Sequence, residues 1–152
     1  MSGPFAGALS VLRVTGGRVV GHGVDIVAID RLKRVYGRFG VRFLKKMLSA
    51  EELTEFASIQ DKNPQRAATY MAGRWAAKEA TYKALGRRGI PFTELATHAG
   101  EHGEPLLSLR GRAKVASDEQ GVAVAHLSIA HEDAYALASV ILESSSEQRC
   151  VM

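Results

Sequence analysis

The sequence predicts a single α+β domain in which an antiparallel sheet packs on one long central helix. Three observations support this prediction. A helix-like segment from about residue 64 to Gly86 is apolar or small over most of its circumference. The second half of the chain changes to short strand-like segments separated by glycine and proline turns. The chain has 152 residues, which is about the length of one domain.

The first predicted element is a strand over residues 19–27, and its two faces differ. One face is apolar apart from one histidine and carries Val20, His22, Val24 and Ile26. The other face carries Gly21, Gly23 and Asp25. Glycine weakens a strand unless something approaches it closely, so we expect open space beside Asp25. The alternative is that Asp25 is a charge that keeps an edge strand soluble.

Two helices are predicted next. Asp30 is the expected N-cap of a basic helix that runs to about Phe39. Residues 49–52 fit a capping box, which predicts a second helix to about Gln60.

The long helix carries the most informative side chains of the chain. It begins with Asn63 as a cap followed by proline, and it stops at Gly86. At 3.6 residues per turn, one face presents Trp75, Glu79 and Lys83 beside the small Ala68, Ala72 and Ala76. The far side carries Arg74, Lys78 and Thr81. A carboxylate and an ammonium among small side chains leave room for an anionic ligand with a metal ion. The alternative is a solvated surface ion pair, worth only about 0.2–0.5 kcal/mol.

The second half of the chain predicts four short strands and a surface helix. The strands are expected over residues 94–99, 106–109, 122–129 and 134–142, and the helix over residues 112–120. Residues 101–105 predict a tight turn, and His131 is expected in the turn between the last two strands. We expect a flexible extension over residues 1–17, the domain over residues 18–143, and a disordered tail over residues 144–152.

The charge of the chain is concentrated in one short segment. The net charge is +4, with 20 basic and 16 acidic side chains. Seven basic residues and no acid lie within residues 31–46: Arg31, Lys33, Arg34, Arg38, Arg42, Lys45 and Lys46. The rest of the chain is therefore acidic on balance, and this local patch predicts docking to an acidic partner. The alternative is a nucleic-acid-binding module without catalysis, although such proteins are usually basic over a broader face.

The sequence disfavours several locations and site types. Cys150 is the only cysteine, so no disulfide can form within one chain, which favours a reducing compartment. No apolar run is as long as a membrane span, and residues 1–24 make a poor secretory signal. We expect a cytoplasmic protein, with the mitochondrion or another organelle as the alternative. The chain has no zinc-binding spacing, Walker loop or dinucleotide-binding glycine loop.

Ligand-type side chains come from three separate elements. Asp25 lies on the first strand, Glu79 and Lys83 lie on the long helix, and His131 follows a late strand. Two carboxylates from different elements suit Mg²⁺, a hard cation that completes its coordination with water and substrate phosphates. Lys83 and His131 would hold phosphate oxygens.

At these residues the sequence resembles the holo-acyl-carrier-protein synthases, the small single-domain type of 4′-phosphopantetheinyl transferase. The motifs are Gly23-Val24-Asp25-Ile26 with Arg31, Arg74-Trp75-Ala76-Ala77-Lys78-Glu79-Ala80-x-x-Lys83-Ala84-x-Gly86, Gly103-x-Pro105, and His126-x-Ser128-x-x-His131-Glu132. They keep the family's order and spacing over about residues 19–143.

The resemblance implies an Mg²⁺-dependent transfer of 4′-phosphopantetheine from coenzyme A to a serine of apo acyl carrier protein, releasing 3′,5′-ADP. It implies that Asp25 and Glu79 are the metal ligands and that Lys83 and His131 contact the coenzyme A phosphates. These four residues are the implied catalytic set, and the turn with Gly103 and Pro105 is implied to lie near the adenine. The sequence does not decide whether Glu79 or a metal-bound water takes the serine proton.

The resemblance also implies partners and an assembly. Carrier docking is implied for the basic helix, through Arg31, Arg34, Arg38 and Arg42. The family works as a homotrimer with each site at a subunit interface. The chain departs from the family at His22, where the usual residue is apolar, and we expect a packing or interface role there. It also departs at Ala130, which replaces the usual hydroxyl residue before the histidine.

Overall fold

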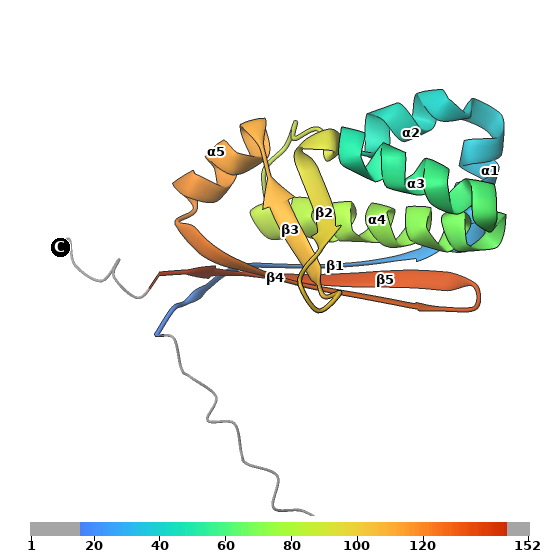
Figure 1. Ribbon diagram of the computed structural model, residues 1–152. Coiled ribbons are helices and arrows are strands. Elements are labelled where there is room, and N and C mark those ends of the chain that lie inside the picture. Colours follow the sequence, from blue (N-terminus) through green and yellow to red (C-terminus); the bar gives the residue numbers. More distant parts are fainter. Residues whose placement is uncertain (1–15, 146–152) are drawn as a thin grey trace, which may run out of the picture.

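The long central helix α4 (Pro64–Leu85) lies between two layers of the molecule, as Figure 1 shows for the computed structural model, which describes residues 16–145. The predicted α+β fold is confirmed. The predictions for the N-terminal extension and the tail fall largely on residues 1–15 and 146–152, which lie outside the described residues. None of the helices within residues 16–145 is long and apolar enough to cross a membrane.

The elements follow the predicted order closely. The other helices are α1 (Ile29–Phe39), α2 (Val41–Met47), α3 (Ala50–Lys62) and α5 (Gly111–Glu119), with a 3₁₀ turn η1 (Phe92–Glu94). The strands are β1 (Val19–Ala28), β2 (Leu95–Ala99), β3 (Pro105–Leu109), β4 (Val122–Glu132) and β5 (Tyr135–Ser144). Helix α2 was not predicted. It has only seven residues, between Gly40 and Leu48, and three of them are basic, so its few apolar residues give no clear helical pattern.

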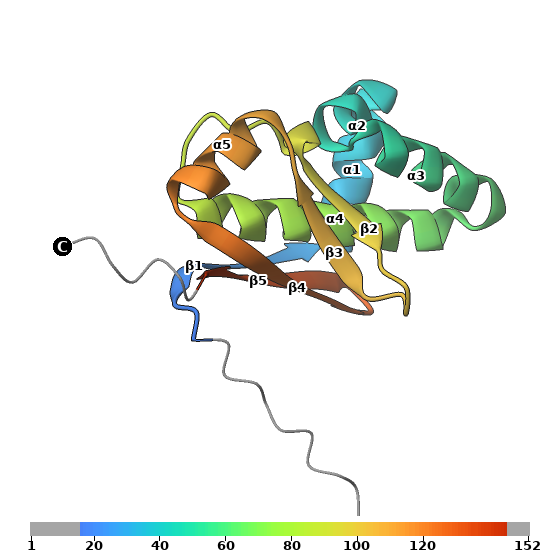
Figure 2. The same ribbon diagram turned by 60° about the vertical axis from the view of Figure 1, so that its left-hand side comes forward.

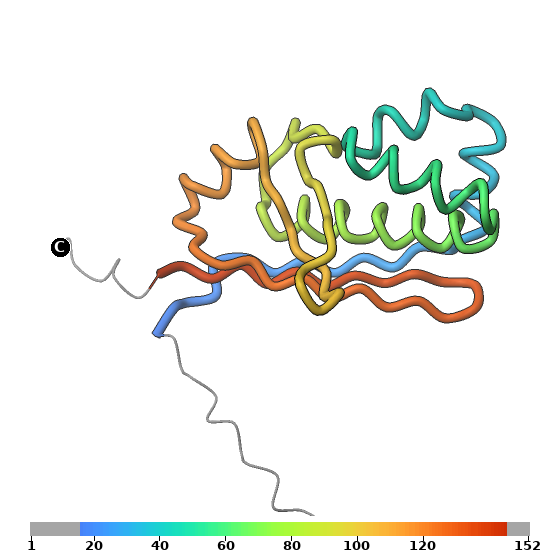
Figure 3. The backbone as a smooth tube through the Cα atoms, viewed as in Figure 1, coloured from blue at the N-terminus to red at the C-terminus, as the bar shows by residue number. Residues whose placement is uncertain are grey.

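The strands form two separate antiparallel sheets. A three-stranded sheet has the order β1-β5-β4 and packs one face on α4, whereas β2 and β3 form a hairpin of their own. Helices α1 to α3 lie on the opposite side of α4 from this sheet, whereas the β2–β3 hairpin crosses beside α4 and reaches the sheet at β4 (Figures 1 and 2). No helix or strand of residues 16–145 covers the other face of the three-stranded sheet. The tube in Figure 3 shows β1 and β5 running side by side.

Local signals placed most helix ends correctly. Ser49 caps α3 through the complete capping box, since its side chain and that of Glu52 each bind the other residue's backbone N–H. The Asn63 side chain accepts from the backbone N–H of Arg66, and Gly86 ends α4 in the left-handed conformation with φ 62°. The prediction for Asp30 was wrong. Helix α1 begins two residues earlier than this cap predicts, with Ala28 as its N-cap, so Asp30 lies in its first turn.

The glycines of β1 allow the close approach of helix α4 rather than of a ligand. A Cβ atom added at Gly23 would lie 1.9 Å from the carbonyl oxygen of Ala80, and one at Gly21 would lie 2.2 Å from that of Ala84. The backbone of α4 therefore fills the space that we expected to be open. A register irregularity between Val19 and Gly21 also turns Val20 towards the core, against the prediction. The close approach brings Asp25 against the helix that carries Glu79 and Lys83.

We expect Gly23→Ala to destabilise the fold by about 3 kcal/mol, because the new methyl group would overlap a backbone carbonyl. Gly37→Ala is the matched control. No atom lies within 4 Å of a Cβ at that position in α1, and alanine is the better helix former, so a gain of about 0.5–1 kcal/mol is expected. Urea denaturation measures both, and equal stabilities would contradict the proposed close contact.

The last hairpin turns later than predicted. Strand β4 continues through Glu132, and the turn consists of Asp133 and Ala134, with Asp133 at a positive φ of 42°. His131 is therefore a strand residue that pairs with Ala136, not a turn residue. This register fixes the place of His131 on the edge strand β4.

Candidate functional site

The candidate site lies where β1 meets the C-terminal half of α4. Asp25 is on the α4-facing side of β1, and its side chain is only 16% exposed. The Nζ atom of Lys83 donates to Asp25 Oδ1 at 3.0 Å and to the carbonyl oxygen of Val24 at 2.9 Å. Lys83 therefore pairs with the strand and not with Glu79, its neighbour on the helix. Asp25 is not a solubility device, because its carboxylate is engaged within the fold.

Glu79 lies one helical turn before Lys83, and the charges of Asp25 and Lys83 both act on its carboxyl group. Burial raises the pKa of the Glu79 carboxyl, and the negative charge of Asp25 raises it further. The positive charges of Lys83 and Arg31 act in the opposite direction and lower this pKa. Asp25 and Glu79 thus form a carboxylate pair whose mutual repulsion a bound cation would relieve.

The donor set fits Mg²⁺ better than a metal held entirely by protein ligands. Within residues 16–145, no group of three or more His, Cys, Asp or Glu side chains is arranged to hold a metal ion. Asp25 and Glu79 could supply two carboxylate ligands. Magnesium is commonly held in this way, by one or two carboxylates with water and substrate phosphates completing its coordination.

His131 does not reach this site within one chain. Strand β5 lies between β1 and β4, and its Ala136 pairs with Val27 on one side and with His131 on the other. Two strand spacings, about 10 Å, therefore separate the β1 and β4 backbones. His131 is exposed, and no hydrogen bond or ion pair among the described residues joins it to Asp25, Glu79 or Lys83.

The turn with Gly103 and Pro105 also lies on the β4 side. Gly103 has a φ of 83°, which favours glycine, and its backbone N–H donates to the carbonyl of Gly100 at 3.1 Å. Pro105 is the first residue of β3 and pairs with Ala99. Strand β3 packs beside β4, and Figure 2 shows the hairpin crossing this part of the molecule. The predicted site residues thus fall into two groups on different edges of the sheet.

The basic segment, residues 31–46, begins close to Asp25 and Glu79. Helix α1 follows β1 directly, and this connection places Arg31 close enough to lower the pKa of Glu79. The predicted docking residues Arg31, Arg34, Arg38 and Arg42 are all exposed. The structure therefore exposes basic side chains on α1 and α2, and the first of them, Arg31, acts on the candidate site.

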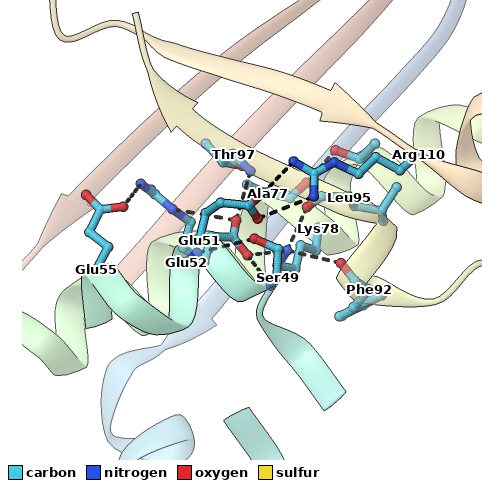
Figure 4. A network of polar contacts seen from close by, with 12 residues as sticks. Ser49, Glu51, Glu52, Glu55, Ala77, Lys78, Phe92, Leu95, Thr97 and Arg110 are labelled. Atoms are coloured by element: carbon cyan, nitrogen blue, oxygen red, sulfur yellow. Dashed lines mark hydrogen bonds and ion pairs between the residues drawn. The ribbon is translucent and has the colours of Figure 1, made fainter. Parts of the chain in front are cut away.

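Sequence reasoning missed a buried ion pair next to Glu79. Lys78 was expected on the far side of α4, and this side is buried under other elements. Its Nζ atom donates to the carbonyl of Leu95 at 2.6 Å, to Glu52 Oε2 at 2.8 Å and to the carbonyl of Phe92 at 3.0 Å (Figure 4). Both charged side chains are almost completely buried. Burial lowers the pKa of Lys78, and the Glu52 carboxylate opposes this shift.

Glu52 joins three parts of the fold through its two oxygens. Oε2 accepts from the backbone N–H of Ser49 at 2.9 Å, and Oε1 accepts from that of Thr97 at 2.8 Å. With Lys78 the carboxylate connects α3, α4 and β2 (Figure 4). A lysine on a helix with almost no solvated face was the available signal in the sequence, since such a lysine requires a partner.

Comparison with known proteins yields a consistent set of matches. A family model described as the 4′-phosphopantetheinyl transferase superfamily matches residues 21–139. A holo-[acyl-carrier-protein] synthase of Vibrio campbellii is 40% identical over 129 residues, covering 83% of this chain and 98% of the relative. A protein of the same name from Alkalilimnicola ehrlichii is 42% identical over 130 residues, covering 84% of this chain and 98% of the relative.

Solved structures agree with these sequence matches. The crystal structure of holo-[acyl-carrier-protein] synthase from Neisseria meningitidis superposes with a TM-score of 0.74 at 33% identity, covering 84% of this chain and 100% of the other. The Helicobacter pylori protein of that name, in complex with coenzyme A, superposes with a TM-score of 0.65 at 30% identity, covering 80% of this chain and 98% of the other.

Proposed function

Because the chain belongs to the 4′-phosphopantetheinyl transferase superfamily, as a holo-[acyl-carrier-protein] synthase, we propose an Mg²⁺-dependent reaction with coenzyme A as the donor. The 4′-phosphopantetheine group passes to a serine hydroxyl of apo acyl carrier protein, and 3′,5′-ADP leaves. The observation that carries the proposal is the close approach of β1 to α4, which brings Asp25 into contact with the ammonium of Lys83 and near enough to Glu79 to raise the pKa of that carboxyl. The coenzyme A complex of the Helicobacter pylori relative supports the choice of donor.

Asp25, Glu79 and Lys83 have different roles in the proposed reaction. When held by Asp25 and Glu79, Mg²⁺ would neutralise charge at the pyrophosphate of coenzyme A. Lys83 is held in place by the Val24 carbonyl and by Asp25, so its positive charge stays at the site for a phosphate oxygen. The serine of the carrier protein is the nucleophile, so the chain needs no nucleophile of its own.

A direct assay tests the proposal. Apo acyl carrier protein is incubated with this protein, coenzyme A and Mg²⁺, and the carrier is weighed by mass spectrometry. We expect a mass increase of one phosphopantetheine group that disappears when EDTA replaces Mg²⁺. No adduct on any of several carriers would refute the proposal. Binding to nucleic acid that falls steeply with salt and ignores Mg²⁺ would favour the alternative module.

We also propose that the protein works as a homotrimer with each site at a subunit interface. Two observations support this. His131 and the Gly103 turn lie apart from Asp25 within one chain, so a neighbouring copy could complete the site. The uncovered face of the three-stranded sheet, which we call the bare sheet face, also carries seven of the eleven exposed large apolar residues among residues 16–145. These seven are Val19, Val24, Ile26, Val124, Tyr135, Leu137 and Ile141. An apolar face of this kind marks an association surface.

The docking assignment makes a separate prediction. We expect Arg38→Glu to raise KM for the carrier about tenfold, because a reversed charge repels an acidic partner. The affinity for coenzyme A, measured by calorimetry, should stay unchanged. Lys114→Glu is the matched control, because Lys114 is an exposed lysine of α5. Helices α5 and α1 lie at opposite ends of α4 (Figure 1). Equal losses of carrier and coenzyme A binding in Arg38→Glu would contradict the assignment.

A further inference from the structure

Two histidines lie in one row across the bare sheet face. His22 on β1 and His126 on β4 both pair with Ile141 on the intervening strand β5. The two rows that follow along the sheet are Val24–Ser139–Ser128 and Ile26–Leu137–Ala130. The face is therefore mainly apolar or uncharged, and the histidines are titratable groups inside it.

The bare sheet face is separate from the candidate catalytic site. Gly23 and Asp25 face α4, and strand alternation turns His22 to the opposite side of β1. His22 is exposed in one chain, and it would be covered if copies of the chain associate through this face. Its titration would then act on assembly rather than on the metal ligands.

The surroundings of the two histidines differ. His126 Nε2 lies 2.8 Å from Glu143 Oε2, so a protonated His126 would have a carboxylate partner. No ion pair or hydrogen bond of the His22 ring is found among residues 16–145. The titratable groups that share the face with His22 are His126 on β4, Glu143 on β5 and, at the far end of the sheet, Glu132 and Tyr135. Glu143 is in contact with His126, and neither of these side chains forms an ion pair with His22 among the described residues.

We propose that His22 makes self-association of this chain pH-sensitive, so that acid weakens the assembly. This inference rests on the proposed homotrimer. A neutral imidazole can be covered by an apolar neighbour, whereas a protonated one would place an unpaired charge in the interface. Histidine is the side chain whose charge ordinarily changes in the physiological pH range. Every copy contributes one such residue, so the effect is repeated at every interface of the assembly.

Sedimentation velocity at pH 7.5 and pH 5.5, at equal ionic strength, tests the proposal. We expect the dissociation constant of the wild-type assembly to rise at least about tenfold at pH 5.5. His22→Leu should lose most of this pH dependence and remain assembled at both pH values. His22→Lys, which carries a fixed charge, should be dissociated already at pH 7.5. Circular dichroism of the same samples shows that the chain stays folded.

The contrary outcomes are separable. An unchanged pH dependence in His22→Leu, or a wild type whose assembly ignores pH or that is monomeric at pH 7.5, would overturn the proposal. A full loss of pH dependence in His126→Leu would assign the pH sensitivity to His126 and would equally overturn the proposal. A protein that assembles as expected but fails to modify any carrier would refute the proposed function and leave the role of His22 standing.

Discussion

Asp25→Asn and Glu79→Gln are each expected to lower kcat/KM for phosphopantetheine transfer about a thousandfold. The amides keep the shapes of the side chains and remove the negative charges on which cation binding depends. A loss of this size corresponds to about 4 kcal/mol of transition-state stabilisation, which is typical of what a bound metal supplies. Initial rates from the mass of the carrier measure the effect, with Mg²⁺ in excess.

The fold of both variants should survive. Asp25→Asn removes the charge from the contact with Lys83 but keeps an oxygen that can accept from it, and that lysine is half exposed, so a change in stability below about 1 kcal/mol is expected. Asp30→Asn is the matched control, because this carboxylate is 78% exposed and lies in the first turn of α1, outside the carboxylate pair. It should keep nearly full activity. Variants of Asp25 or Glu79 that retain a tenth of wild-type activity would contradict their role as metal ligands.

Lys78→Met is expected to destabilise the protein by about 3–5 kcal/mol. The substitution leaves the buried Glu52 carboxylate without its nearest charge partner and with only the Arg74 guanidinium, 3.9 Å away, and removing one member of a buried pair has an effect of this size. It also leaves the carbonyl groups of Phe92 and Leu95 without their donor. Urea denaturation at equal protein concentration measures the loss, since assembly makes stability concentration-dependent.

The double variant separates the charge from the packing. Glu52→Gln in the Lys78→Met background removes the buried charge and gives up one of the two backbone hydrogen bonds that the carboxylate accepts, so it should recover only part of the lost stability. The exposed pair of Lys114 with Asp118 provides the control, and Lys114→Met should change stability by less than about 1 kcal/mol. A double variant that is no more stable than Lys78→Met would show that the buried charge is not the cause.

The helix boundaries that sequence reasoning found have local causes. The capping box of Ser49 and Glu52, the Asn63 cap and the glycine at position 86 are each decided within a few residues. The error at Asp30 has the same origin, because an acid suits the first turn of a helix as well as its cap. Local chemistry therefore placed elements but could fix some ends only to within two residues.

The contacts that sequence reasoning missed are long-range. Glu52 lies in the first turn of α3 and Lys78 in the second half of α4, so most of α3 and more than half of α4 separate them in the sequence. The capping box also already explained the Glu52 carboxylate. The contact of Lys83 with Asp25 also depends on how closely β1 approaches α4, and this follows from the backbone position of Ala80 against Gly23. The sequence motifs grouped these charged residues in one site, but only the packing shows which atoms meet.

The most direct measurement is anomalous diffraction from crystals grown with coenzyme A and Mn²⁺ in place of Mg²⁺. The carboxylate pair predicts one anomalous peak at coordination distance from oxygens of both Asp25 and Glu79, with the ion also touching a phosphate of coenzyme A. A peak that touches only one of the two side chains, or an ion bound elsewhere while coenzyme A is in place, would contradict a cation shared by these two residues.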